Sequence, residues 1–199
     1  MEVIFGLGTG RCGTHSLAHL FNSQNSSSFS HEIGGIPFLP WEPSKGTFRH
    51  AIGTVEESGA DFVGDVAFYW LRYVNDIIEL YPTAKFVVLQ RDRQAVIDSY
   101  MKWTPTRNHW KSHMGLEWLE CTWDNCFPTY SNDLTKEEAI GKYWDEYYSR
   151  VDILERIHPL HFYHFKTEHL NDESKVQTML EWCGFKDIKP ITNIRLAIT

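Results

Sequence analysis

A cluster of glycines near the amino terminus has the composition of an anion-binding loop. The cluster follows an apolar run at residues 3–5, and residues 14–22 then show the apolar spacing of an amphipathic helix. The glycines are Gly6, Gly8, Gly10 and Gly13. A strand, a glycine turn and a helix in this order direct backbone N–H groups and a helix N-terminus at one anion, most often a phosphate. Because glycine also allows positive φ and close approach by a ligand, we expect a phosphate site here.

The loop departs from the two nucleotide-binding patterns that it resembles in spacing. The Walker pattern requires a lysine directly after its last glycine, but Thr14 stands there, and the cationic residue is Arg11 inside the loop. No apolar strand ends in a clear magnesium-binding aspartate unless Asp65 serves. The glycine spacing also matches the dinucleotide-binding pattern, and Glu32 lies at a suitable distance for its acidic ribose partner. Both ATP and NAD therefore stay open as ligands at this point.

A second group of anion-binding residues follows the most apolar strand pattern, at residues 85–90. Arg91 ends this strand, and Ser99 lies eight residues later on a predicted helix. A guanidinium makes bidentate, charge-assisted contacts with a phosphate, and a serine hydroxyl adds a neutral donor. The alternative is a surface arginine and an unrelated helix serine. Together with the glycine loop, the pair predicts a ligand with two separate phosphates.

The overall composition restricts the classes of ligand. The chain has 199 residues, a net charge of −7 and 15% aromatic residues. An acidic chain is not suited to general nucleic-acid binding, so an anionic ligand needs a local basic site. We see no signal peptide and no apolar run of membrane-spanning length, and the four cysteines are scattered along the chain. We therefore expect reduced cysteines and a soluble, cytoplasmic protein.

Alternating strand and helix patterns predict an α/β fold. Strands are expected near residues 3–5, 29–32, 61–66, 85–90 and 160–165, and helices near 14–22, 48–58, 69–81, 93–103, 136–157 and 174–183. This alternation gives a central parallel sheet of about five strands with helices on both faces, a three-layer α/β/α sandwich. Ligands of such sheets bind beyond the carboxyl ends of the strands. The glycine loop, His31, Glu32, Asp65 and Arg91 all fall at such ends.

We predict one domain over residues 1–199, with a tryptophan-rich insertion or lid at about 104–135, where no regular period is seen. The tryptophans are expected to pack the lid, and some of them to contact an acceptor. Zinc-ligand types in this segment are His109, His113, Cys121 and Cys126. Their spacing is irregular and tryptophans intervene, so we expect no zinc site. The sequence gives no indication of the oligomeric state.

The two anion motifs together resemble the sulfotransferase family that uses 3′-phosphoadenosine 5′-phosphosulfate. Residues 10–17 (GRCGTHSL) resemble the family's 5′-phosphosulfate loop, and residues 85–91 with Ser99 resemble its 3′-phosphate motif. Residues 63–69 and 162–170 are similar to the family's third-strand segment and late strand. The resemblance covers most of the chain in the right order and implies a P-loop-like fold. It also implies sulfuryl transfer to a hydroxyl or amine of a carbohydrate or small molecule, with adenosine 3′,5′-bisphosphate as the product.

The resemblance assigns roles to the motif residues. The 5′-phosphate and the leaving oxygen would be held by the loop, namely Gly10, Arg11, Cys12, Gly13, Thr14, His15 and Ser16. Arg91 and Ser99 would hold the 3′-phosphate, which distinguishes this donor from ATP. Because arginine and the helix terminus neutralise the developing charge, no metal is required. Arg11 is therefore expected to act in catalysis as well as in binding.

The acceptor must lose a proton to a base. The resemblance implies a glutamate after the second strand, and Glu32 occupies this place. His31 is the rival candidate and Asp65 the third. Because neighbouring strand residues face opposite ways, we expect only one of His31 and Glu32 to point into the site, and we favour Glu32. Glu32 and Asp65 are also the expected contacts with the acceptor.

The chain departs from the family pattern at several positions. Arg11 replaces a lysine, Cys12 a serine and His15 a threonine, and Arg93 stands at the usual proline position after Arg91. The glycine-rich C-terminal cofactor motif of the animal cytosolic enzymes is not visible. These differences concern the substrate branch more than the use of the donor. The alternatives are a P-loop kinase, which predicts magnesium-dependent ATP binding, and a non-catalytic nucleotide-binding protein that has lost the base.

Overall fold

The computed structural model describes residues 1–33, 40–41, 45–56, 59–111 and 122–189. Its sheet has five parallel strands in the order β2-β3-β1-β4-β5. The strands are β1 Glu2–Leu7, β2 Ser27–His31, β3 Phe62–Val66, β4 Lys85–Gln90 and β5 Phe162–Lys166. The α-helices are α1 Thr14–Asn22, α2 Lys45–Glu56, α3 Val74–Leu80, α4 Arg93–Trp103, α6 Lys136–Ile157 and α7 Glu173–Cys183. Three 3₁₀ turns are η1 Phe68–Tyr73, η2 Thr122–Cys126 and η3 Thr167–Asn171.

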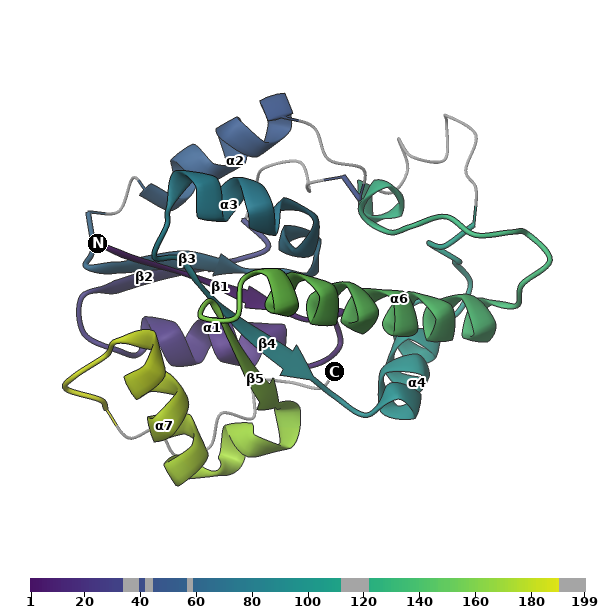
Figure 1. Cartoon of the computed structure of the whole chain (residues 1–199). Helices are drawn as coiled ribbons and strands as arrows, with labels where there is room; N and C mark the ends of the chain where they lie inside the picture. The colour runs from purple at the N-terminus through teal and green to yellow at the C-terminus, as the bar shows by residue number, and fades with distance from the viewer. Residues whose placement is uncertain (34–39, 42–44, 57–58, 112–121, 190–199) are drawn as a thin grey trace.

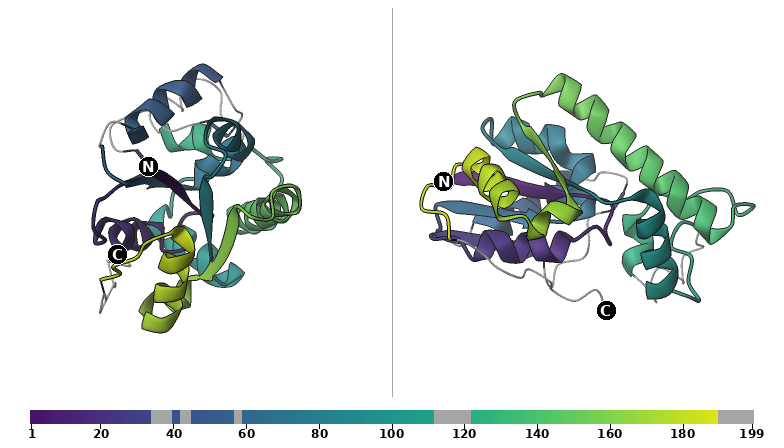
Figure 2. Two further views of the ribbon diagram at one scale, coloured as in Figure 1. Left: turned by 60° about the vertical axis from the view of Figure 1, so that its left-hand side comes forward. Right: turned by 90° about the horizontal axis from the view of Figure 1, so that it is seen from below.

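Helices cover both faces of this sheet (Figures 1 and 2). Side chains of the central strands alternate between two cores. Phe5 and Phe86 pack in the core that also holds residues of α2, η1, α3 and α6, whereas Ile4 and Val87 pack with residues of α1 and α7. Strands that are apolar on both faces are typical of a buried parallel sheet. The predicted three-layer α/β/α sandwich is thereby confirmed.

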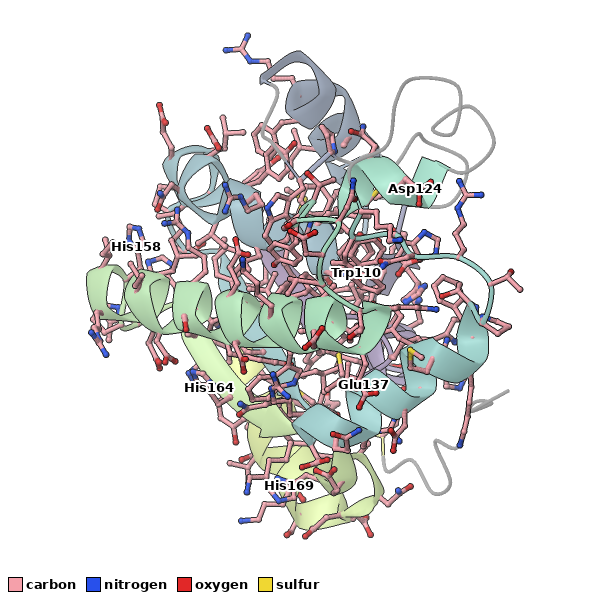
Figure 3. The ribbon with its side chains drawn as sticks, turned by 90° about the vertical axis from the view of Figure 1, so that its right-hand side faces the viewer. Trp110, Asp124, Glu137, His158, His164 and His169 are labelled. Atoms are coloured by element: carbon pink, nitrogen blue, oxygen red, sulfur yellow. The ribbon has the colours of Figure 1, made fainter. Side chains whose placement is uncertain are left out.

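The long helix α6 has the bounds that its sequence pattern predicts, as do α1 and α4. A capping box begins it: the Thr135 hydroxyl accepts the Glu138 N–H at 3.2 Å, and the Glu138 carboxylate accepts the Thr135 N–H at 2.8 Å. In Figure 3, α6 crosses the molecule between Glu137 and His158. Its C-terminal part lies over the sheet, and its N-terminal part extends past the carboxyl ends of the strands and packs against α4 (Figure 1).

Some elements have other bounds than expected, and three of these differences have a local physical reason. The helix expected over residues 69–81 is α-helical only at α3, because its first part is the turn η1. Five of the six η1 side chains are buried, so packing on all sides overrides the helical period. Strand β2 ends at His31, and Glu32 lies outside it with a φ of +55°. Strand β5 begins at Phe162, two residues later than predicted, because Leu160 is 87% exposed.

The tryptophan-rich segment lies partly outside the described residues, which exclude 112–121. In the described part, Trp110 is buried against the rings of Tyr100, Phe127 and Tyr143. Figure 3 shows it between α6 and the segment that carries Asp124. The interpretation of a single domain with a lid stays a prediction. None of the helices in the described part of the chain is both long and apolar enough to cross a bilayer.

Candidate active site

The glycine loop joins β1 to α1 at the carboxyl edge of the sheet. Gly10 and Gly13 have φ values of +77° and +94°, and Arg11 between them has a φ of +54°. Positive φ favours glycine and is uncommon for other residues, so the arginine backbone is held in an unusual conformation. Gly13 is the N-cap of α1, and its lack of a side chain leaves the first N–H groups of this helix without a side-chain cap. The loop thus has the geometry of an anion site.

The two predicted anion motifs meet at Arg11. Its Nε donates to Ser99 Oγ at 3.1 Å, and Arg91 Nη1 donates to its carbonyl oxygen at 2.9 Å. The Arg11 guanidinium also lies over the ring of Trp103, 5.4 Å from the ring centroid. Trp144 Nε1 donates to the carbonyl oxygen of Arg91 at 3.3 Å, which holds the backbone just after β4. Arg11 of the loop, Arg91 after β4 and Ser99 on α4 are therefore in contact, and we call these three residues the basic cluster.

Glu32 follows β2 in a strained turn that Asp65 supports. Glu32 and Ile33 have φ values of +55° and +31°, and Asp65 Oδ1 accepts the Ile33 N–H at 3.1 Å. Trp70 Nε1 donates to the other oxygen of Asp65 at 2.5 Å, and the Asp65 side chain is buried. Strained backbone persists where the surroundings fix it, and it often occurs at functional sites. Asp65 therefore holds the turn that presents Glu32, and its expected contact with an acceptor stays a prediction.

His31 and Glu32 lie on the same side of the site. His31 Nε2 is 3.9 Å from Glu32 Oε1 and 3.0 Å from Thr14 Oγ1, and the ring centroids of His31 and His15 are 5.0 Å apart. The expectation that the two side chains face opposite ways is wrong. The reason is that β2 ends at His31 and the positive φ of Glu32 breaks the strand alternation. Both candidate bases therefore lie near the start of α1.

Burial sets the protonation states of these groups. Burial and, to a smaller extent, the charge of Asp65 raise the pKa of Glu32 to about 8, while the positive charge of Arg11 opposes the rise. Glu32 is thus mainly protonated at neutral pH and ionises as the pH passes 8. Burial, with a smaller contribution from His15, lowers the pKa of His31 to about 4, so His31 is neutral at pH 7. Burial also raises the pKa of Asp65.

Cys12 stands in the loop where the family pattern has a serine. Its side chain is fully buried and packs with Leu17 and Leu89 in the core beneath the loop. Burial raises the pKa of the Cys12 thiol to about 12. Because a thiol with this pKa stays protonated at neutral pH, Cys12 is a packing residue and not a nucleophile. The contact of Cys12 with the donor stays a prediction. Because the side chain is buried, this contact would have to be made by the Cys12 backbone N–H.

A buried ionic network lies in the described part of the tryptophan-rich segment. The buried Asp124 carboxylate accepts from the Arg107 guanidinium and pairs with His109 Nδ1 at 2.6 Å. The zinc pattern considered for this segment also includes His113 and Cys121, which lie outside the described residues. Within the described ranges, no group of three or more His, Cys, Asp or Glu side chains could hold a metal ion. The network therefore joins residues 107–109 to η2 within the segment.

The structure places the predicted site residues along one edge, at the ends of four different strands. Arg11, Arg91 and Ser99 form the basic cluster, while Glu32 and its neighbour His31 lie near the start of α1. Of the remaining loop residues, Thr14 and Ser16 have buried side chains and His15 is exposed. The contacts of all these residues with a ligand stay predictions.

The residues that hold the loop from the side of the core belong to no motif in the sequence. The hydroxyls of Tyr100, Tyr143 and Tyr147 all bind the backbone of residues 8–9. Thr167, directly after β5, likewise binds the loop. The four-residue spacing of Tyr143 and Tyr147 indicates a shared helix face. No local pattern shows, however, that their hydroxyls reach a loop more than 130 residues earlier in the chain.

Comparison with known proteins gives one family match for the sequence. A family model described as a sulfotransferase domain matches residues 49–183. The matched part includes Asp65, Arg91, Ser99 and Thr167, and it begins after the glycine loop. No curated protein matches the sequence at a significant level.

Two solved structures share the fold over almost the whole chain. A sulfotransferase from Alicyclobacillus acidocaldarius aligns with a TM-score of 0.59 and 15% identity, over 100% of this chain and 87% of that chain. Mouse sulfotransferase SULT7A1 complexed with PAP aligns with a TM-score of 0.57 and 9% identity, over 93% of this chain and 60% of that chain. At these identities the likeness establishes the P-loop-like fold, whereas the family model covers more than half of the sequence. The chain therefore belongs to the sulfotransferase domain family and is a sulfotransferase enzyme.

Proposed function

We propose that the sulfuryl donor is 3′-phosphoadenosine 5′-phosphosulfate, held between the glycine loop and the start of α4. The contact between Arg11 and Ser99 carries this proposal, because it joins the cation of the loop to the second anion motif. A nucleotide with phosphates on both the 3′ and the 5′ oxygen of its ribose requires two such groups of hydrogen-bond donors. The PAP complex of mouse SULT7A1, a protein of the same fold, supports the choice of nucleotide.

The two groups would divide the donor between them. The 5′-phosphate would bind Arg11 and the N–H groups at the start of α1, from Gly13 to Ser16. Arg91 and Ser99 would bind the 3′-phosphate. Because the Arg11 charge and the positive end of the helix would both face the 5′-phosphate, they would stabilise the charge that grows on the leaving oxygen. The proposal therefore requires no metal ion.

The transfer step needs a base near the acceptor. The acceptor oxygen attacks sulfur, the bond from sulfur to the 5′-phosphate oxygen breaks, and the bisphosphate leaves with the electron pair. We propose that Glu32 takes the acceptor's proton, with His31 as the alternative. A general base works best when its pKa lies near the working pH. The pKa of Glu32 is about 8 and that of His31 about 4, so Glu32 is the better matched group.

The donor proposal is tested by isothermal titration calorimetry with adenosine 3′,5′-bisphosphate, ATP with magnesium, and NAD. We expect the bisphosphate to bind most tightly, with no need for magnesium. Preferential binding of ATP with magnesium would replace the proposal by a P-loop kinase. Preferential binding of NAD would identify a dinucleotide site.

We further propose that the acceptor is a hydroxyl or amine of a carbohydrate or small molecule. The test is a panel of carbohydrate, phenol, alcohol and amine acceptors incubated with radiolabelled donor. Label transfer to one class would identify the acceptor. Glu32→Gln should then lose most of the transfer rate while it keeps the affinity for the bisphosphate. Normal turnover of Glu32→Gln would exclude Glu32 as the base and favour His31.

A further inference from the structure

The glycine loop is held by side chains that bind its carbonyl oxygens from the side of the core. Thr9 O accepts two tyrosine hydroxyls, from Tyr100 on α4 at 2.6 Å and from Tyr143 on α6 at 3.1 Å. At the other end of the loop, Cys12 O accepts the Thr167 hydroxyl at 2.5 Å. Three side chains from three elements thus point at two peptide groups of one short loop.

Two more tyrosines of α6 complete this arrangement. The Tyr147 hydroxyl accepts the Gly8 N–H at 2.9 Å and donates to Phe68 O at 3.0 Å. The Tyr148 hydroxyl donates to Leu89 O at 2.6 Å, and this oxygen lies close to Gly8 of the loop. We call Tyr100, Tyr143, Tyr147 and Tyr148 the tyrosine cluster. All four side chains are buried, so their hydroxyls need the protein partners that the loop and its neighbours supply.

The orientation of these carbonyl groups determines where the loop N–H groups point. A trans peptide is planar, so its C=O and its N–H point in opposite directions, and the described part of the chain contains no cis peptide. Because Cys12 O points at the Thr167 hydroxyl, the Gly13 N–H of the same peptide group points away from Thr167. Because Thr9 O points at the tyrosines, the Gly10 N–H points away from them, toward the Cys12 thiol. A hydrogen bond from this N–H opposes the rise that burial causes in the pKa of the thiol. The Thr167 contact therefore sets the direction of the Gly13 N–H, whereas the tyrosine contacts fix the peptide group between Thr9 and Gly10 against the buried Cys12 thiol.

The glycines of the loop pack closely against the side chains that hold it. An added Cβ at Gly10 would overlap the hydroxyl of Tyr100, and one at Gly13 would lie 3.2 Å from Thr167 Cγ2 and 3.1 Å from Leu170 Cδ1. The same side chains that bind the loop carbonyls therefore pack directly against its glycines. Both glycines have positive φ, a conformation that must be kept for the carbonyls to stay on the core side.

We propose that the tyrosine cluster and Thr167 are positioning residues that hold the glycine loop in its donor-binding conformation. The inference deepens the proposed function and rests on it for the identity of the ligand. A preorganised loop binds an anion without first ordering its own backbone, which strengthens binding. Removing these hydroxyls should therefore weaken donor binding more than the loss of a buried hydroxyl elsewhere in the fold.

The first test uses Thr167. Thr167→Val keeps the shape of the side chain and removes its hydroxyl, so Cys12 O loses its partner. We expect the Kd for adenosine 3′,5′-bisphosphate, measured by calorimetry, to rise about tenfold, as for the loss of one buried hydrogen bond. Thr167→Ser, which keeps the hydroxyl, should restore the affinity to within about threefold of wild type. The same affinity in both variants would overturn the role of the hydroxyl.

The second test uses the tyrosines. The double variant Tyr100→Phe/Tyr143→Phe removes both donors to Thr9 O, and the matched control is Tyr73→Phe. Tyr73 is also buried, and its hydroxyl donates to a backbone carbonyl outside the loop, Pro40 O, at 3.3 Å. We expect the double variant to raise the Kd at least about tenfold and the control to stay within about twofold. An equal change in Kd in the double variant and the control would show that the Tyr100 and Tyr143 hydroxyls do not position the loop.

Amide hydrogen exchange separates this inference from the identity of the ligand. If wild type does not bind the bisphosphate, the proposed donor is wrong, but exchange at residues 8–14 still reports the order of the loop. We expect faster exchange there in Thr167→Val and in the double tyrosine variant than in wild type and Tyr73→Phe. Unchanged exchange at residues 8–14 in both variants would refute the inference whatever the donor is.

Discussion

The charge of Glu32 gives a prediction that needs no knowledge of the acceptor. Burial raises the pKa of Glu32 from 4.5 to about 8 in the folded protein. Between these values the folded state binds more protons than the unfolded state, so the free energy of unfolding must fall as the pH rises. Each pKa unit corresponds to about 1.36 kcal/mol, which gives an upper limit of about 5 kcal/mol for this loss. Domains have only about 5–15 kcal/mol of stability in total, so the effect should be easy to measure.

The substitution Glu32→Gln isolates this contribution, because glutamine does not ionise. Denaturant unfolding at pH 5 and at pH 9 gives the free energy of unfolding of both proteins. We expect the stability of Glu32→Gln relative to wild type to increase from pH 5 to pH 9, by several kcal/mol at most. The pKa of Asp65 is also raised, but Asp65 is present in both proteins and contributes less to the difference. The same pH dependence in both proteins would refute a raised pKa at Glu32.

The same pKa predicts the pH dependence of transfer. If Glu32 is the base, about one molecule in ten is active at pH 7, since only the ionised form accepts a proton. With an alcohol acceptor that does not itself ionise, kcat/KM should rise roughly tenfold between pH 7 and pH 10 and then level off. If His31, with a pKa of about 4, is the base, the rate should be flat from pH 6 to pH 10. A flat profile would therefore contradict the assignment of Glu32.

Two further substitutions test the loop and its surroundings. Gly10→Ala places a methyl group against the Tyr100 hydroxyl at a backbone φ of +77°. We expect a loss of about 1–3 kcal/mol of stability and weaker bisphosphate binding. Normal calorimetric affinity in this variant would show that the loop tolerates another conformation. Arg93→Ala removes an exposed ion pair with Asp145. The free energy of unfolding, measured with denaturant, should fall by at most about 1 kcal/mol. Weaker bisphosphate binding in this variant would show that Arg93, a departure from the family pattern, has a role in the site.

Helices and strands were predictable where one local signal dominated. Helix α6 begins where the capping box of Thr135 and Glu138 places it, and α7 ends at Gly184, which has the positive φ of a helix C-cap. The apolar strand β4 has the predicted bounds because a strand buried on both faces needs apolar residues throughout. These signals act within a few residues, so the sequence alone was sufficient to read them.

The details of the site depend on contacts between distant parts of the chain. Strand alternation predicts opposite directions for His31 and Glu32, but Asp65 holds the Ile33 N–H and keeps the turn at positive φ. The sequence placed Asp65 at the correct strand end without indicating this contact. The sequence motifs assign Arg11 to the 5′-phosphate and Ser99 to the 3′-phosphate, whereas in the structure a hydrogen bond joins the two side chains. Such contacts arise from the sheet order, which no local pattern specifies.

The two-phosphate site is tested most directly by a ratio of affinities. Calorimetry gives the affinities of wild type and Ser99→Ala for adenosine 3′,5′-bisphosphate and for adenosine 5′-phosphate, which differ only in the 3′-phosphate. A hydrogen bond to a charged group contributes about 1.5–3 kcal/mol, so we predict that wild type prefers the bisphosphate by at least about tenfold. Ser99→Ala should lower this preference and leave the affinity for the monophosphate within about threefold. Equal affinity of the wild-type protein for the two nucleotides would contradict a 3′-phosphate site at Arg91 and Ser99.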